Sequence, residues 1–356
     1  MTSRRRALGS HRVAGRVRLS RAHGEPLSRA TLRAGPEDFS VEEELGFAPA
    51  GTGQHVLLKV RKRNANTHWV ARELAQSCGC RPADVGYAGL KDRRAVAVQW
   101  FSVPQSRLTP EAWRAVRGAD FEVLEAHAHS RKLPRGALAA NSFTIRVRNV
   151  EVDDTRLAQR VAEIRRRGVP NYFGPQRFGR DGANLVRAQQ LRSLRARERG
   201  LVLSAARSLV FNAVLAERVR DGSWEHLAEG DIANLDGRGS IFPVGALEQE
   251  LLERCQRLEI HPTGPLWGRG APDSSRRVLE LEARVAAEFP QPCALVAAAG
   301  MRQERRSLRL AVRDLSWIRD SAAIEVRFRL TRGSFATAVL RELIESDAAQ
   351  QEDAES

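Results

Sequence analysis

The sequence predicts an α+β fold in which a mixed, largely antiparallel sheet is interrupted by a mainly helical α+β insertion. Strand-like runs dominate residues 1–165, whereas Gly- and Pro-rich sequence and then helical periodicity dominate from Gly168 onward. A strand pattern returns near the C-terminus at 324–330. A strand-rich start, a helical middle and a strand-rich end together indicate a discontinuous domain that carries an insertion.

In the first part, strand-like pieces occupy 32–41 and 55–60. A helix is expected to begin at Asn66 or Thr67, either of which can cap it. It should stop at Gly79, because glycine is the usual residue just past a helix end.

Two longer strands follow, over 95–103 and 141–148. The first is rich in β-branched and aromatic residues. In the second, Phe143, Ile145 and Val147 alternate with polar residues, so this strand should bury one of its faces.

The later elements are mainly helical. From Ser204, apolar residues recur at helical spacing until Gly222. The returning strand is followed by a Gly333-Ser334 turn and a helix over 335–343. Free backbone N–H groups at the start of that helix could hold a phosphate, although capping explains the same two residues equally well.

The formal charge is +15, from 58 basic and 43 acidic residues. Such an excess indicates a polyanionic partner, most commonly nucleic acid, although arginine enrichment across a whole genome would produce it too. No apolar run approaches the ~18 residues of a membrane span. The 4 cysteines form no CxxC pair, which favours reduced, buried thiols and no structural metal.

The two ends of the chain differ in character. Residues 1–22 contain seven arginines and no acid, and we interpret them as a basic flexible arm, although a transit-type leader would look similar. Residues 345–356 are acidic and small, and are predicted to be a disordered tail.

Asp92 is the strongest candidate for a catalytic residue. It lies in a Gly-rich turn, GYAGLKDRR over 86–94, directly after Lys91 and before two arginines. Neighbouring cations favour the ionised form of a carboxylate, which can then act as a nucleophile or a base. A salt-bridged surface turn would show the same residues, so this turn alone does not decide.

A second Gly-rich segment, at 168–180, mixes aromatic and basic side chains, among them Tyr172, Arg177 and Arg180. Bases that stack on rings while phosphates meet arginines need such a mixture, but rings tucked under a domain edge would look alike. Phe143 is equally open, because a core residue and a ring beside a nucleobase need the same rigid strand. No Walker loop, HExxH or GxGxxG after a strand is present, which favours cofactor-free chemistry.

Two long motifs stand out along the chain, GYAGLKDRRAV over 86–96 and PNYFGPQRFG over 170–179. Shorter ones lie, in chain order, at 36–39, 141–143, 203–212 and 333–343. Together they resemble the signature of the TruD family of tRNA pseudouridine synthases. The resemblance covers most of the chain, from about Leu32 to Leu343.

The resemblance implies a pseudouridine-synthase catalytic domain over 23–166 and 309–344, split by a family-specific insertion at 167–308. It implies isomerisation of uridine to pseudouridine in tRNA, at position 13 in the bacterial members, by cleavage of the N1–C1′ bond and re-attachment through C5. It implies no cofactor, metal, membrane or protein partner. The expected partner is tRNA and the expected location is the cytoplasm.

The resemblance also implies roles for single residues. Asp92 matches the catalytic aspartate, and Phe143 matches the aromatic residue that packs against the target base, with Asn141 beside it. Arg33 stands where many members carry lysine, so its contact with Asp92 or a phosphate rests on charge rather than identity. Lys91 is a further expected substrate contact. Whether Asp92 attacks the sugar or removes a sugar proton to give a glycal stays open.

Two other classes of function compete with this interpretation. A non-catalytic, basic tRNA-binding or folding factor would use the same positive charge without needing Asp92. Hydrolytic RNA cleavage would call for a second acid, a histidine pair or a metal cluster, and the sequence shows none of these. The intact 86–96 segment favours the isomerase.

Overall fold

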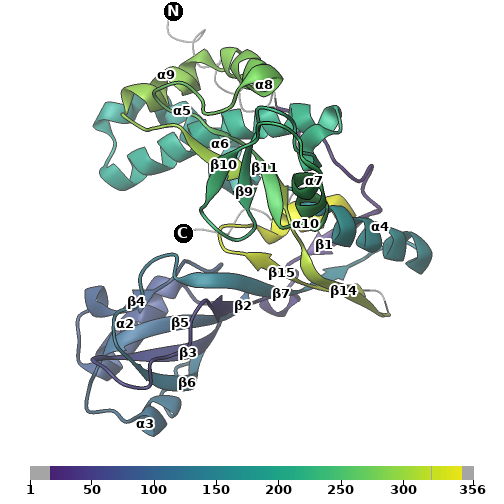
Figure 1. Cartoon of the computed structure of the whole chain (residues 1–356). Helices are drawn as coiled ribbons and strands as arrows, with labels where there is room; N and C mark the ends of the chain where they lie inside the picture. The colour runs from purple at the N-terminus through teal and green to yellow at the C-terminus, as the bar shows by residue number, and fades with distance from the viewer. Residues whose placement is uncertain (1–16, 322, 347–356) are drawn as a thin grey trace, which may run out of the picture. The chain divides into compact units, whose positions relative to one another are not determined.

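The computed structural model describes residues 17–321 and 323–346, which form two compact, discontinuous units (Figure 1). The sheet unit comprises Leu27–Asp154, Arg313–Gly333 and 344–346. The helical unit comprises 17–26, Thr155–Val312 and Ser334–Leu343.

The sheet unit is built on a 10-stranded sheet with the central order β14-β15-β7-β2-β5-β3-β6 (Figure 1). In that order these strands are β14 Arg313–Asp320, β15 Ala323–Thr331, β7 Leu138–Arg148, β2 Phe39–Leu45, β5 Val96–Pro104, β3 His55–Arg63 and β6 Phe121–His129. Neighbours run antiparallel except for the parallel pair β2–β5. The mixed, largely antiparallel sheet is therefore confirmed.

Shorter elements complete this unit. β1 (Ser28–Leu32) pairs with β7 and, in parallel, with β16 (Ile344–Ser346), while β4 (Gly86–Tyr87) pairs with β5. Its α-helices are α2 Thr67–Cys78 and α3 Pro110–Arg114, and its 3-10 turns are η1 Pro36–Asp38 and η2 Pro82–Asp84.

Helix α2 begins and ends where its capping residues predict. Asn66 is the N-cap residue in extended conformation, and Gly79 ends the helix with φ 72°, which favours glycine. Val70 and Leu74 pack against Leu58 of β3 and other buried residues, so α2 covers one face of the sheet. A separate apolar cluster, which includes Trp100 of β5, covers the other face.

The helical unit surrounds the long helix α6, Ala196–Arg220 (Figure 1). Its other α-helices are α4 Asp154–Arg167, α5 Ala183–Val186, α7 Gln249–Gln256, α8 Arg276–Ala287, α9 Pro290–Ala298 and α10 Ala336–Leu343. Its 3-10 turns are η3 Pro175–Phe178, η4 Arg180–Gly182, η5 Arg187–Ser193 and η6 Ser223–Glu225. A small sheet has the order β10 (Ile241–Pro243), β9 (Ile232–Leu235), β11 (Ile260–Leu266) and β12 (Glu304–Ser307), and β8 (Val169–Pro170) pairs with β13 (Arg309–Leu310).

Helix α6 starts eight residues earlier than the Ser204 that its apolar spacing indicates, because Gly200 and charged residues hide its first two turns. By length and composition alone it could cross a membrane, but 72% of its most apolar 18-residue window is buried inside the protein. It is the core helix of this unit.

Three of the expected segments can be compared with the structure: the N-terminal arm, the C-terminal tail and the insertion. The expected flexible arm falls mostly on residues 1–16, outside the described residues, but Val17 and Leu19 pack against the apolar core of the helical unit. The expected tail likewise lies outside the described residues from 347 onward, whereas β16 reaches Ser346. The compact helical unit is also wider than 167–308, because α4 and α10 belong to it.

Candidate active site

Asp92 lies in the loop 88–95, which joins β4 to β5 in the sheet unit. Buried polar side chains tie this loop to the sheet and to α2. Gln99 of β5 donates a hydrogen bond from Nε2 to the carbonyl of Gly89 (2.6 Å), and Thr67 accepts one from the Lys91 N–H (3.1 Å). Thr67 in turn donates to Gln99 Oε1 (3.0 Å), so the two anchors support each other.

A third anchor is Lys62, whose side chain is 0% exposed. Its Nζ donates to the main-chain carbonyls of Asp92 (2.8 Å) and Ala65 (2.7 Å). Burial lowers the pKa of Lys62 to about 8, and the Asp92 carboxylate opposes that shift. The backbone of the aspartate is therefore held by a buried, titratable amine.

The Asp92 side chain itself stays 33% exposed, which leaves its carboxylate accessible. Its Oδ2 lies 2.5 Å from Nη2 of Arg33, which follows β1. Arg33 has a φ of 57°, in the left-handed region that a non-glycine residue seldom adopts. Strained backbone at such a position is a common property of functional sites.

Behind the loop, Glu43 of β2 is buried and forms an ion pair with Lys91 (2.6 Å). Its other carboxylate oxygen accepts the N–H of Trp100 (2.9 Å). Burial raises the pKa of Glu43, whereas the adjacent Lys91 lowers it. The Lys91 ammonium is thus paired with a buried carboxylate, and its expected role as a substrate contact stays a prediction.

The predicted substrate residues lie on the same sheet face as these buried polar groups. Glu43 stands opposite Asn141 in the β2–β7 register, and Val41 stands opposite Phe143. Because side chains alternate along strands, Glu43, Asn141 and Phe143 project from one face. Asn141 is buried, and among the residues that the structure describes its Oδ1 has no hydrogen-bond partner.

Phe143 forms part of an aromatic row across three strands. Its ring stacks on Phe328 of β15 (5.3 Å between centroids, 27°) and meets Phe39 of β2 edge-on (6.0 Å, 72°). The guanidinium carbon of Arg33 lies 4.1 Å from the Phe39 ring centroid. Phe143 is only 8% exposed, so in this structure it is a buried residue, and its expected contact with the target base stays a prediction.

The three residues expected to bind RNA all lie in the helical unit. Tyr172 is 2% exposed and packs in the core of this unit, so its expected role in RNA binding stays a prediction. Arg177 is half-buried and donates to Ser204 Oγ (3.3 Å), while Arg180 is exposed. The sequence pattern of 168–180 does not distinguish a buried tyrosine from an exposed one, because both can lie beside arginines.

Sequence reasoning missed Lys62, Glu43, Gln99 and Thr67 as parts of the site. Each comes from a different strand or helix, and only the strand register brings them together. One weak signal existed for Lys62, because it is one of few lysines in a chain whose cations are almost all arginine.

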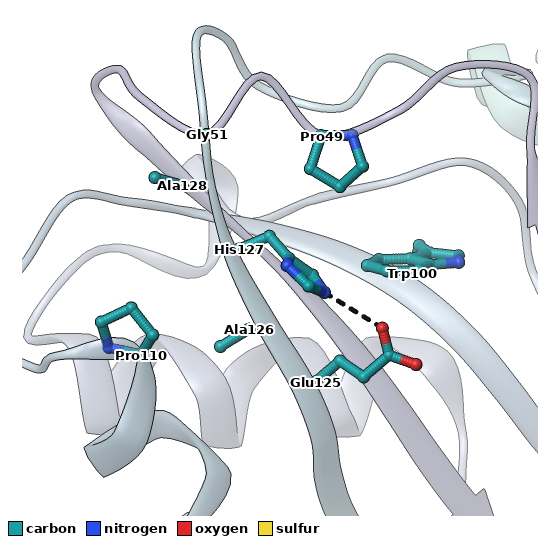
Figure 2. A pocket seen from close by; sticks show the side chains of 8 residues that line it. All are labelled: Pro49, Gly51, Trp100, Pro110, Glu125, Ala126, His127 and Ala128. Carbon is teal, nitrogen blue, oxygen red and sulfur yellow. Dashed lines mark hydrogen bonds and ion pairs between the residues drawn. The ribbon is translucent and has the colours of Figure 1, made fainter.

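The structure also contains a pocket of about 580 Å³ in the sheet unit (Figure 2). It lies on the sheet face opposite Gln99, because Trp100 lines it and neighbouring residues of a strand point to opposite faces. In Figure 2, His127 and Glu125 point toward each other, and their hydrogen bond is 3.0 Å long. Asp92 does not line this pocket, so the candidate active site is the polar sheet face and not this cavity.

Metal ligation has no evident site in the part of the chain that the structure describes, since no three His, Cys, Asp or Glu side chains converge there. The expectation of a metal-free and cofactor-free reaction remains a prediction. The four cysteines are free thiols, of which Cys255 is buried and the others half-buried.

Known proteins resemble this chain both in sequence and in fold. The family profile described as tRNA pseudouridine synthase D (TruD) matches residues 22–188 and 181–343. The tRNA pseudouridine synthase D of Methylococcus capsulatus is 46% identical over 336 residues, covering 92% of this chain and 95% of that protein. That of Nitrosococcus oceani is 44% identical, covering 94% and 96%.

A crystal structure of a Methanosarcina mazei protein provisionally named tRNA pseudouridine synthase D superposes with a TM-score of 0.70. It covers 91% of this chain and 95% of the other at 21% identity, and at that identity it supports the fold alone. The α+β architecture with a mixed, largely antiparallel sheet is the fold of a pseudouridine synthase. Within that class, the chain belongs to the TruD family.

Proposed function

We propose that this protein isomerises uridine to pseudouridine at position 13 of tRNA, with Asp92 as the catalytic carboxylate. The observation that carries the proposal is one continuous series of contacts inside the sheet unit. Asp92 contacts Arg33, Arg33 lies over Phe39, and Phe39 meets Phe143. A carboxylate, a cation and an aromatic ring are therefore adjacent on one sheet face. These groups suit a reaction that breaks the bond between ribose and uracil and then joins the two again.

The target uridine has to leave its base stack before Asp92 can reach the sugar. Once flipped, its ring packs beside Phe143 on the same sheet face. The Asn141 amide then hydrogen-bonds to the polar edge of the uracil, which gives its buried Oδ1 the partner that it lacks among the residues described by the structure. Arg33 keeps the Asp92 carboxylate oriented until the sugar arrives.

Two routes satisfy the chemistry. In one, a carboxylate oxygen bonds to C1′ while the N1–C1′ bond breaks and its electron pair leaves on uracil; the uracil turns, and C5 displaces the carboxylate. In the other, the carboxylate removes the C2′ proton as N1–C1′ breaks, which gives a glycal, and it returns that proton to C2′ as C5 bonds to C1′. In both, C5 finally loses its proton and N1 gains one.

Neither route uses a cofactor, a metal or a protein partner. The proposed substrate is tRNA, which lies in the cytoplasm, so we expect the protein there as well. The positive charge of +15 supports binding of a polyanion.

The proposal is tested by pseudouridine mapping on unmodified tRNA incubated with wild type and with Asp92→Ala, in EDTA. Pseudouridine at position 13 with the wild type only is the expected result. If both proteins bind tRNA and neither forms pseudouridine, the protein is a tRNA-binding or folding factor. If the wild type forms pseudouridine in Mg²⁺ but not in EDTA, the metal-free route is wrong.

Phe143 offers a second, independent test. Phe143→Leu keeps an apolar core residue but removes the flat ring, so single-turnover rate should fall about tenfold or more while tRNA affinity changes less. Val147→Leu on the same strand, which is fully buried away from the aromatic row, controls for general repacking. Equal losses in rate and affinity would make Phe143 merely structural.

A further inference from the structure

Arg135 of the sheet unit is an exposed cation that is nevertheless held in one place. Its guanidinium carbon lies 3.8 Å from the centroid of the Tyr87 ring, and its Nη2 donates a hydrogen bond to the Tyr87 hydroxyl (2.7 Å). Tyr87 is 7% exposed and packs in the apolar cluster under α2, so its ring is a fixed support. Holding a long side chain in this way costs conformational entropy that a fully solvated arginine keeps.

The Tyr87 hydroxyl lies between Arg135 and His68 of α2. Its oxygen is 2.8 Å from His68 Nδ1. Because a guanidinium can only donate, the hydroxyl oxygen accepts from Arg135, and its own proton is available to His68 Nδ1. With Nδ1 as the acceptor of that proton, His68 turns the oxygen of the hydroxyl toward the guanidinium.

The turn that carries Arg135 is fixed to the loop of Asp92. Gly136, the next residue, has a φ of 75°, a left-handed conformation that glycine adopts without strain. Its N–H donates a hydrogen bond to the carbonyl of Ala88 (2.7 Å), the first residue of the loop 88–95. Backbone contacts therefore set the position of Arg135 beside the Asp92 loop.

No carboxylate balances the charge of Arg135 within residues 17–321 and 323–346. Over the same residues its Nη1 and Nε have no hydrogen-bond partner, and the acceptor of Nη2, a phenol hydroxyl, is neutral. The first turn of α2, where His68 lies, contains no acidic residue, so the positive end of that helix adds to the local potential. A bound anion would offset both contributions.

We propose that Arg135 binds one phosphodiester group of the tRNA backbone beside the Asp92 loop, and that Tyr87 and His68 position it. The identity of the ligand as tRNA rests on the proposed function. A guanidinium that stacks on a ring keeps its N–H edge available, and that edge matches two oxygens of a phosphate. A phosphate held there fixes the RNA backbone close to the loop whose carboxylate has to reach the sugar.

The first experiment measures the affinity of unmodified tRNA between 50 and 300 mM KCl. Arg135→Gln should weaken binding about tenfold and lower the salt slope by about 0.7–0.9, because one charged contact to a phosphate is lost. Arg135→Lys should keep the slope and lose part of the affinity, since it keeps the charge but not the fork. The matched control is Arg114→Gln, an exposed arginine in α3 at the β6 edge of the sheet, which should change neither quantity.

The roles of Tyr87 and His68 have their own test. Tyr87→Phe keeps the ring and removes the hydroxyl, so affinity should fall a few-fold while the slope stays unchanged. His68→Ala should cause a similar loss, and the double variant should lose no more than either single one, because both act through the same hydroxyl. Losses that add would overturn the positioning role of His68.

Ethylation interference then identifies the contact on the RNA, because ethylation neutralises single phosphates. Arg135→Gln should lose one of the interfering positions that the wild type shows, whereas Arg114→Gln should keep all of them. An unchanged interference pattern in Arg135→Gln, or affinities equal to those of Arg114→Gln, would overturn the proposal and make the contact with Tyr87 merely structural.

Arg135 could also hold a free phosphate, which a thermal midpoint in inorganic phosphate against chloride of equal ionic strength distinguishes. A stabilisation that Arg135→Gln abolishes, without any loss of tRNA affinity, would overturn the assignment to the RNA backbone. A wild type that binds no tRNA would overturn it too. Failure of the proposed function is distinguishable, because a wild type that binds tRNA without forming pseudouridine leaves the interference test of Arg135 in force.

Discussion

At the scale of single residues, Arg33 donates a hydrogen bond to the Asp92 carboxylate from one nitrogen, Nη2, and its guanidinium group lies over the Phe39 ring. The contact uses charge rather than a bidentate fork. Arg33→Lys should therefore keep activity within about tenfold, whereas Arg33→Gln should lose about 100-fold or more. Single-turnover pseudouridine formation measures both rates.

The control for this pair is Arg63→Gln, which breaks a similar but exposed ion pair with Glu37 and should leave the rate unchanged. Equal losses in Arg33→Lys and Arg33→Gln would contradict the prediction. They would show that the fork geometry or the stacking on Phe39 matters more than the charge.

Lys62 predicts an unusual dependence of stability on pH. Its pKa falls from 10.5 to about 8 on folding because the ammonium is buried. Between these values the unfolded chain binds more protons than the folded one, so stability should rise with pH. The cost of burying the charge is fully present below about pH 8 and disappears toward pH 10.5.

Urea unfolding of wild type and Lys62→Met at pH 7.5 and 9.5 measures this effect. The difference in unfolding free energy between the two proteins should shift by about 2 kcal/mol in favour of the wild type at the higher pH. Other titrating groups cancel because both proteins share them. A difference that stays constant with pH would mean that Lys62 is neutral, or charged, throughout.

At the scale of elements, β4 positions the Asp92 loop through a close approach at Gly86. A Cβ there would lie 2.6 Å from the carbonyl oxygen of Leu133 and 2.5 Å from Ser102 Oγ, whereas a Cβ at Gly89 would meet nothing closer than 3.9 Å. Gly86→Ala should displace β4, cost about 1–3 kcal/mol and slow the reaction. Gly89→Ala, in the same loop, is the matched control and should be close to neutral.

Thermal unfolding and single-turnover rates of the two variants decide this prediction. If Gly86→Ala lowers the reaction rate but not the stability, the substitution displaces the Asp92 loop without destabilising the sheet unit. Equal behaviour of the two variants would show that β4 has room to shift and does not set the position of Asp92.

The sequence predicts elements better than it predicts the site. Capping and alternation give the bounds of α2 and β7 within a few residues, because those signals are local. Glycine inside α6 hides its start, since local pattern cannot show that packing holds Gly200 in a helix. Asp92 stands out through its motif, but Lys62 and Glu43 join it only through strand register, which is a long-range property.

At the scale of the whole molecule, the chain passes between the two units five times, at residues 26, 154, 312, 333 and 343. The helical unit therefore depends on segments that lie far away in sequence. Arg341 of α10 lies 4.9 Å over the Tyr172 ring and donates to the carbonyl of Leu19 (2.8 Å). Glu342 accepts the N–H groups of Ala22 and His23 (3.0 and 3.2 Å).

This dependence predicts that the fragment 155–312 is unstable by itself. Without residues 334–343, the Tyr172 ring loses Arg341 and the Phe173 ring loses Phe335. Burying two aromatic side chains is worth several kcal/mol, which is comparable to the whole stability of a domain. The fragment joined to 334–343 by a long Gly/Ser linker should unfold at a higher urea concentration, and addition of a 17–26 peptide should raise the midpoint further. Equal midpoints for the bare and joined fragments would instead support the narrower insertion at 167–308, with α10 outside it.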